Sequence, residues 1–208
     1  MSAPRQLIEG FRRFRERSLV GNAQFHELVR FGQTPTTLVV GCCDSRVDPA
    51  LILDCAPGDL FVIRNVANLV PPAENQGQYH GTSAALEFGV CNLGVQHIIV
   101  LGHAQCGGIH ALLEGGVATE DSFIAEWMSI AAAARERIER EHAGAGSKER
   151  HRACEQQAIL VSLNNLMTFS WIRERVELGR LALHGWYFDI ERGELLGYDA
   201  AKGRFETL

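Results

Sequence analysis

Hydrophobic positions along the chain follow two patterns, and each predicts a different kind of element. Short apolar runs at Thr37–Gly41 and His97–Gly102 are rich in β-branched residues and typical of buried parallel strands. Leu60–Ile63 is a third buried run of this kind. Two later runs, 181–190 and 194–198, are separated by a short polar turn and predict an antiparallel closing pair.

Between these runs, apolar residues recur at three- and four-residue spacing, which predicts helices. The longest should run from Thr119 to about Glu141. Thr119 is a suitable N-cap, and Glu120 and Asp121 follow in the first turn. The Gly-rich stretch 143–147 breaks the pattern. Further helices are predicted at 5–17, 22–31, 79–93, 107–113 and 147 to about 169, with a loop at 71–77.

Strands that alternate with helices predict an α/β fold: a mainly parallel central β-sheet flanked by helices, with an antiparallel C-terminal strand and an N-terminal helical arm at 1–33. The chain has 208 residues, of which 46% are hydrophobic, enough for one substantial core. Because there is no repeat and no convincing linker, 1–208 is predicted to be a single domain.

Chemically active side chains follow two of the predicted strands. Cys42, Asp44 and Arg46 come directly after the first run, and His103 and Cys106 follow the run that ends at Gly102. Open α/β sheets bind ligands at the carboxyl ends of their strands, so these groups should meet at one edge if the two strands are neighbours. Two sulfurs, one nitrogen and one carboxylate form a zinc ligand set.

Either half of this set alone would be weak evidence for a metal site. A lone His103-x-x-Cys106 favours a packed core cysteine and a turn histidine, because cysteine is readily buried. The two halves together are more specific, because both follow apolar strands and the first also carries an acid and an arginine. A purely structural zinc site would not need Asp44 and Arg46.

Cys42-x-Asp44-Ser45-Arg46 together with His103-x-x-Cys106 resembles the β-class carbonic anhydrases. The resemblance extends from about Gln33 to Tyr198. It includes three further segments, Arg64-Asn-Val-Ala-Asn-Leu-Val-Pro71, Gly81-Thr-Ser-Ala-Ala-Leu-Glu-Phe88 and Leu183-His-Gly-Trp186. It implies an enzyme, a zinc lyase that interconverts carbon dioxide and bicarbonate.

We therefore expect one zinc per chain, bound by Cys42, His103 and Cys106, with water in the fourth position. Zinc-bound hydroxide would attack carbon dioxide, and two thiolate ligands should shift activity toward alkaline pH. Asp44 has two alternatives. It can bind zinc and close the site, or pair with Arg46 and orient the hydroxide.

The resemblance also implies how the substrate is bound. Phe61, Val66 and Phe88 would form the apolar wall, and the Gln33 side chain and the Gly107 amide would donate hydrogen bonds. Without the resemblance, Phe61 and Val66 would be read as core residues. Phe88 stands where the family often has tyrosine.

One branch of the family binds bicarbonate at a noncatalytic site through a tryptophan, an arginine and a tyrosine. The arginine is present here as Arg64, but the tryptophan position is Val39 and the tyrosine position is Phe188, with Tyr187 next to it. The loss of two donors predicts that bicarbonate inhibits only as a product, and that Asp44 stays paired with Arg46.

Composition limits the partners. A net charge of −5 gives no reason to expect nucleic acid or an anionic membrane, and no apolar run approaches the roughly 18 residues that cross a bilayer. Six irregularly spaced cysteines and no apparent secretory signal favour a reducing, cytoplasmic location.

The arm at 5–17 has one apolar face. With the resemblance, this face predicts a homodimer, or a tetramer or larger assembly built from dimers. The face consists of Leu7, Ile8, Phe11 and Phe14.

Two alternatives remain open on sequence. The same scaffold and ligands could hydrolyse carbonyl sulfide or carbon disulfide. The cluster could instead be a noncatalytic structural zinc site, or an unmetallated Cys–His nucleophile.

Overall fold

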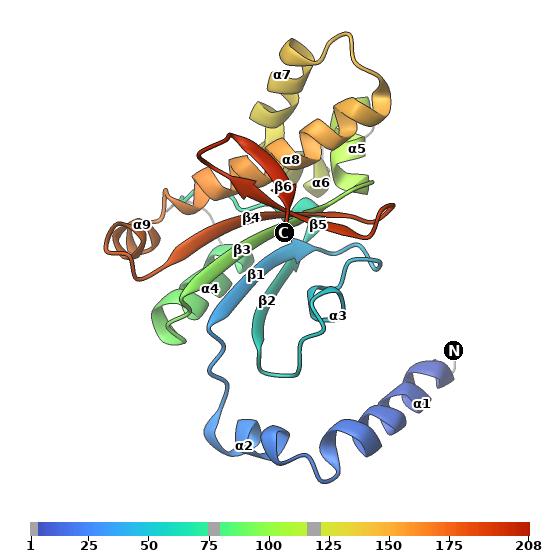
Figure 1. Cartoon of the computed structure of the whole chain (residues 1–208), viewed down its shortest axis with the longest axis vertical. Helices are drawn as coiled ribbons and strands as arrows, with labels where there is room; N and C mark the ends of the chain where they lie inside the picture. Colours follow the sequence, from blue (N-terminus) through green and yellow to red (C-terminus); the bar gives the residue numbers. More distant parts are fainter. Residues whose placement is uncertain (1–3, 75–79, 116–121) are drawn as a thin grey trace.

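A computed structural model of the chain describes residues 4–74, 80–115 and 122–208. Its centre is a six-stranded sheet in the order β2-β1-β3-β4-β5-β6 (Figure 1). The first four strands of this order are parallel, and β5 and β6 run antiparallel to their neighbours. The strands are β1 (Thr37–Cys42), β2 (Leu60–Asn65), β3 (His97–His103), β4 (Ala182–Asp189), β5 (Glu194–Asp199) and β6 (Arg204–Thr207). This is the predicted fold class.

Strand β1 is the buried centre of the parallel part. It lies between β2 and β3, and its residues from Leu38 onward are buried, as the continuous apolar run predicts. Gly41 is in register with Leu101, so the carboxyl end of β1 lies beside the carboxyl end of β3. The register therefore brings the side chains after the two strands to one edge of the sheet.

Strand β2 differs from the expectation of a third buried strand. It lies at the edge of the sheet, where only β1 pairs with it. Ile63 is its one buried residue, and Val62 is 38% exposed. An apolar run indicates a strand but does not show whether both faces are covered, and the prediction of burial was wrong for this reason.

Three helical segments cover one face of the sheet: α4 (Gly81–Glu87) with the π-helical turn after it, α8 (Ser147–Leu166) and α9 (Ser170–Glu177). Their apolar side chains pack on alternate residues of the parallel strands. This core contains Leu38, Val40, Ile98, Val100, Leu86, Val90, Ile159, Leu166 and Ile172. The strand residues between them, Val39, Ile99 and Leu101, face the opposite side with Trp186 and Phe188.

A second core lies beyond the carboxyl end of the sheet. There α5 (Gly107–Glu114), α6 (Phe123–Met128) and α7 (Ala132–Glu141) pack against the first half and middle of α8 and the segment after β2 (Figure 1). Gly108 allows this approach, because an added Cβ would lie 2.9 Å from the Val66 Cγ1. Cys42 and Cys106 belong to this core.

The N-terminal arm extends away from the sheet (Figure 1). It consists of α1 (Arg5–Phe14), a π-helical turn (Arg15–Leu19) and α2 (Ala23–Phe31), with Asn22 capping α2 through the Phe25 amide. Leu7 is 70% exposed and Phe11 57% exposed, so the apolar face of the arm is uncovered in a single chain.

Some element boundaries differ from the sequence predictions. The expected N-cap Thr119 and parts of the expected segments 71–77 and 79–93 lie outside the described residues. In the described part, α6 begins after Ser122, whose Oγ accepts a hydrogen bond from the Ala125 amide at 3.3 Å. Strand β6 and α9 were not predicted. Each is short, and β6 presents two charged side chains around Phe205.

Among the residues described, no helix has the combined length and apolar character that a bilayer-spanning segment requires.

Candidate metal centre and active site

Three buried side chains converge at the carboxyl edge of the sheet. Cys42 ends β1, His103 ends β3, and Cys106 precedes α5. One potential ligand atom of each lies within 4.8 Å of the others, and the residues are 5%, 1% and 2% exposed. The predicted pairing of the two motifs is thus present in the folded chain.

A tight turn returns the chain from His103 to Cys106. Gln105 adopts a left-handed conformation with φ of +59°. Such a φ is unusual for a residue with a side chain. In this conformation Cys106 lies against Cys42 and His103 instead of continuing along the direction of β3.

The two ring nitrogens of His103 have different environments. Nδ1 lies 2.9 Å from the carbonyl oxygen of Ala104, which can only accept, so this nitrogen carries the proton and donates. Nε2 is buried and, among the described residues, has no hydrogen-bond partner. An unpartnered buried acceptor is costly unless something binds it. Its lone pair therefore fits a metal ion.

The two thiols interact directly. A hydrogen bond from the Cys106 thiol lowers the pKa of Cys42, and the same contact, together with burial, raises the pKa of Cys106. The contact therefore favours the thiolate form at Cys42 and disfavours it at Cys106. Two thiolates this close require a positive ion between them, and thiolate sulfur with imidazole nitrogen is a donor set that zinc prefers.

Asp44 and Arg46 form a two-pronged ion pair beside the ligands. Arg46 Nε donates to Asp44 Oδ1 at 3.0 Å, and Nη2 donates to Oδ2 at 2.8 Å. The Arg46 backbone amide also donates to Oδ1, at 2.9 Å. These contacts hold the pKa of the Asp44 carboxyl well below its usual range, so it is ionised at neutral pH. This is the second of the two alternatives for Asp44.

Arg46 also connects the two ligand loops. Its Nη1 and Nη2 atoms donate to the side-chain and main-chain oxygens of Gln105, at 3.2 and 3.1 Å. The side-chain Nε2 of Gln105 in turn donates to Glu191 Oε1 at 2.6 Å. Sequence reasoning did not identify Gln105, although its position between His103 and Cys106 was a usable signal.

Arg64 holds the backbone of the first motif. Its guanidinium donates to the carbonyl oxygens of Cys42 at 2.9 Å and Asp44 at 2.8 Å, and to Asp48 Oδ2 at 2.8 Å. Tyr187 is fully buried and donates its hydroxyl to Glu155 Oε2 at 2.7 Å. Whichever of Tyr187 and Phe188 occupies the tyrosine position, no free hydroxyl is available there.

Glu155 is a buried acid behind Cys106 that the sequence analysis missed. Its Oε1 atom accepts the Cys106 amide hydrogen at 3.0 Å, and Oε2 accepts the Tyr187 hydroxyl. Burial raises the pKa of the Glu155 carboxyl. Its signal in the sequence was weak, because it is one of two acids in a helix that mixes polar and apolar residues.

The expected substrate residues are divided between the two ends of the sheet. Val66 follows β2 and Gly107 begins α5, so both lie near the ligands, and the Gly107 amide has no partner within its helix. Phe61 is in register with Leu38, four residues before Cys42, which is about 13 Å along the strand. Phe88 lies 5.9 Å from Phe61 between ring centroids, and Gln33 precedes β1.

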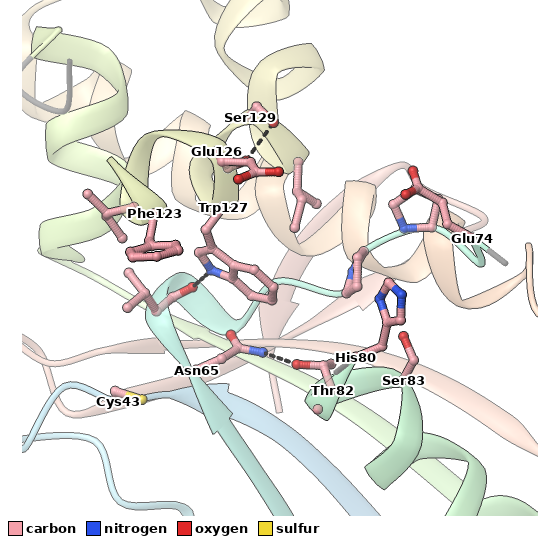
Figure 2. A pocket seen from close by; sticks show the side chains of 16 residues that line it. Cys43, Asn65, Glu74, His80, Thr82, Ser83, Phe123, Glu126, Trp127 and Ser129 are labelled. Atoms are coloured by element: carbon pink, nitrogen blue, oxygen red, sulfur yellow. Dashed lines mark hydrogen bonds between the residues drawn. The ribbon is translucent and has the colours of Figure 1, made fainter. Parts of the chain in front are cut away.

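A pocket of about 830 Å³ lies next to the ligand cluster. Figure 2 shows Trp127 in its centre, between Phe123 on one side and His80 on the other. The Trp127 indole donates to the Val66 carbonyl at 2.8 Å, and Cys43 and Asn65 form the floor. Cys43 is exposed and is not among the converging ligands, as the alternation of side chains along an extended segment predicts.

Comparisons with known proteins agree with this geometry. The carbonic anhydrase family model matches residues 37–195. The chain is 35% identical to beta carbonic anhydrase 3 of Arabidopsis thaliana over 93% of the chain and 76% of that protein. It is 38% identical to the mitochondrial beta carbonic anhydrase 6 of the same plant, over 86% of the chain and 62% of that protein, which is less than two thirds of its length.

Two solved structures have the same fold. The β-carbonic anhydrase CcaA is 35% identical, with a TM-score of 0.92 over 98% of this chain and 91% of that one. A structure from work on two tetrameric β-carbonic anhydrases of Sordaria macrospora is 30% identical, with a TM-score of 0.82 over 93% of this chain and 95% of that one.

Proposed function

The chain belongs to the β-class carbonic anhydrases, and on this premise we propose that it catalyses the reversible hydration of carbon dioxide to bicarbonate and a proton, with one zinc ion per chain. The observation that carries the proposal is the buried cluster of Cys42, His103 and Cys106. In this cluster Nε2 of His103 has no partner in the described chain, and a ring nitrogen of His103 and the two cysteine sulfurs lie within 4.8 Å of one another. The neighbouring Asp44–Arg46 pair distinguishes it from a purely structural site.

Cys42, His103 and Cys106 would hold the metal. Zinc, when bound, supplies hydroxide from water at a pH near neutral. Three protein ligands leave the fourth position open, provided that Asp44 stays away from it. Arg46 keeps Asp44 away through two parallel hydrogen bonds, which fix both carboxylate oxygens. Asp44 would then be placed to accept a hydrogen bond from the nucleophile that zinc supplies and to orient it toward carbon dioxide.

The position of the substrate wall supports an oligomeric enzyme. Val66 and the Gly107 amide are close to the ligands of their own chain, whereas Phe61, Phe88 and Gln33 lie toward the other end of the sheet. A second copy of the chain would bring these three residues to the metal. The exposed apolar face of the arm gives that copy a surface to bind, and we propose a homodimer or an assembly of dimers.

The surroundings of Arg64 support the absence of a noncatalytic bicarbonate site. Its donors bind Cys42, Asp44 and Asp48, and Val39 and Phe188 lie in one apolar cluster. A bicarbonate ion beside Arg64 would have to displace these contacts without gaining an indole or a phenol donor. We propose that bicarbonate inhibits only as a product.

The cysteines support a reducing compartment. None of the six, all of which lie in the described residues, forms a disulfide, including the exposed or half-buried cysteines at 43, 55 and 91. A cytoplasmic location is therefore part of the proposal.

Zinc analysis combined with stopped-flow carbon dioxide hydration tests the function. We expect about one zinc per chain, and loss of both metal and activity in Cys42→Ser, His103→Ala and Cys106→Ser. Cys43→Ser is the matched control, because this neighbouring cysteine is exposed, and it should keep both. Full activity of metal-free protein would contradict the proposal. Zinc without hydration would indicate a structural site, and faster hydrolysis of carbonyl sulfide would indicate the sulfur substrates.

A further inference from the structure

A second group of potential metal ligands lies outside the catalytic cluster. His110 and Glu114 are one turn apart on the same face of α5, and His151 faces them from α8. One ligand atom of each lies within 4.8 Å of the others. We propose that these three side chains form a second metal site, which takes a divalent transition-metal ion of the zinc class and joins α5 to α8.

The spacing of the residues suits this role. Residues four apart on a helix project to the same side, so His110 and Glu114 offer a nitrogen and an oxygen together. Nε2 of His151 lies 3.3 Å from Glu114 Oε1, and the rings of His110 and His151 are 4.6 Å apart between centroids. Two imidazoles and one carboxylate are a donor set found at zinc sites that keep an open position.

The orientation of His151 is a further indication. Its Nδ1 atom lies 3.4 Å from the Ser147 hydroxyl, one turn earlier on α8, and Nε2 is directed to Glu114. Histidines that bind metals commonly have the other ring nitrogen held by a neighbouring polar group, which fixes the ring. A simple ion pair between His151 and Glu114 would explain one contact, but not the second imidazole stacked on the first.

The surroundings leave room for a hydrated ion. A cavity of about 540 Å³ is lined by Cys106, His110, Ser147, His151, Glu155 and Tyr187, among others. Glu114 is 55% exposed, so water can complete the coordination. Nitrogen ligands favour zinc, cobalt, nickel or copper over magnesium or calcium, which prefer oxygen. Because exposed side chains lose freedom when they bind an ion, this site should bind zinc more weakly than the buried cluster of Cys42, His103 and Cys106.

Such an ion would stabilise the start of α5. This helix begins at Gly107, directly after the ligand Cys106, and His110 lies in its first turn. Fixing α5 against α8 should therefore slow fluctuations that separate Gly107 from the catalytic cluster. The site does not depend on the proposed reaction, because it shares no ligand with the first cluster.

Equilibrium dialysis of the full-length holoenzyme against rising zinc tests the inference. Wild-type protein should bind about two zinc ions per chain, in one tight and one weaker class. His110→Ala, Glu114→Gln and His151→Ala should each weaken the second class at least about tenfold and keep the first. Ser147→Ala should weaken it less. Zinc beyond one equivalent should raise the melting temperature of the wild type and not of these ligand variants.

His142→Ala is the matched control, because this histidine follows α7 and belongs to neither cluster. Cys42→Ser should show the converse pattern, with the tight class lost and the weaker class kept. A second equivalent that persists in all three ligand variants would overturn the site, as would wild-type protein that binds one zinc only. If a histidine variant fails to fold, the exposed Glu114→Gln change alone decides the outcome.

Discussion

The two ends of the parallel sheet differ in how far their proposed functional residues are buried and held by other parts of the same chain. At the carboxyl end, Cys42, His103 and Cys106 are buried, and hydrogen bonds from Arg46 to Asp44 and Gln105 and from Arg64 to the Cys42 carbonyl hold the chain around them. At the amino end, Gln33 is exposed, Phe88 is 45% exposed, and the arm extends away from the sheet. One chain therefore brings all three candidate metal ligands together by itself, whereas three of the proposed substrate residues, Gln33, Phe61 and Phe88, lie toward the other end of the sheet.

This contrast shows what a single chain can supply. The pairing of β1 with β3 forms within one chain, and its register aligns the residues that follow the two strands without help from a partner. Apolar groups at the opposite end cannot reach the ligands by any side-chain movement, since the separation along the strand is about 13 Å. A catalytic site that needs both ends requires two chains.

Apart from the loss of a metal ligand, the largest effect is expected at the carboxyl end, from Asp44→Asn. The variant should retain zinc, because the three ligands are unchanged, and should lose roughly 100-fold in kcat, because the group that orients the nucleophile loses its charge. Parallel zinc analysis and stopped-flow hydration check this. Loss of the metal would instead make Asp44 a required ligand.

Changes at the amino end should have a smaller effect. Gln33→Ala combined with Phe88→Ala should lower kcat/KM about tenfold with zinc content unchanged, because the wall and one donor are lost while the ligands stay intact. Val29→Ala on α2 is a control that truncates another exposed apolar side chain, since Val29 is 72% exposed. Unchanged kinetics in the double variant would separate these residues from the substrate.

Tyr187→Phe tests the support behind the metal centre. The change leaves the buried Glu155 carboxylate without its 2.7 Å hydrogen bond, and this should cost about 1–3 kcal/mol of folding stability. Thermal unfolding against wild type measures the loss. Phe205→Leu is a suitable comparison, because it removes the ring that lies 6.3 Å from Tyr187 without removing a hydroxyl. An unchanged melting temperature in Tyr187→Phe would show that Glu155 is satisfied in another way.

The smallest effect is expected from the pH dependence of stability that the His97–His184 pair causes near the amino end of the sheet. His97 Nδ1 and His184 Nε2 lie 3.2 Å apart, and burial, with repulsion from His97, lowers the pKa of His184. The folded state therefore favours the neutral ring. Its stabilising contribution is complete above the unfolded pKa of about 6.5 and is lost as the pH falls from there through the lower folded value.

His184→Gln should therefore flatten the decline in melting temperature between about pH 7 and pH 5. His26→Gln on α2 is the control, because His26 is exposed and should leave the slope unchanged. A steeper decline in His184→Gln than in wild type would contradict the sign of this argument.

The sequence predicted most of the candidate site at the carboxyl end of the sheet, because the residues that indicate it stand directly after apolar strand patterns. The thiols, the imidazole and the Asp44–Arg46 pair follow apolar strands, so the fold class could be expected from pattern, and the convergence could be expected on the condition that the two strands are neighbours. Gln105, Glu155 and the backbone contacts of Arg64 were missed because they depend on tertiary neighbours. The exposure of β2 was missed because strand order is not encoded in the hydrophobicity of one strand.

The division of the site between two chains can be measured by subunit complementation. Two variants are needed. Cys106→Ser lacks a metal ligand but keeps the substrate residues Gln33 and Phe88. Gln33→Ala combined with Phe88→Ala lacks these substrate residues but keeps all three metal ligands. If the wall comes from a partner, mixed dimers contain one complete site. Unfolding and refolding the two variants together at equal amounts should then recover about a quarter of wild-type activity, well above the sum of the separately refolded variants. Activity equal to that sum would contradict the account and place the wall and the metal in the same chain.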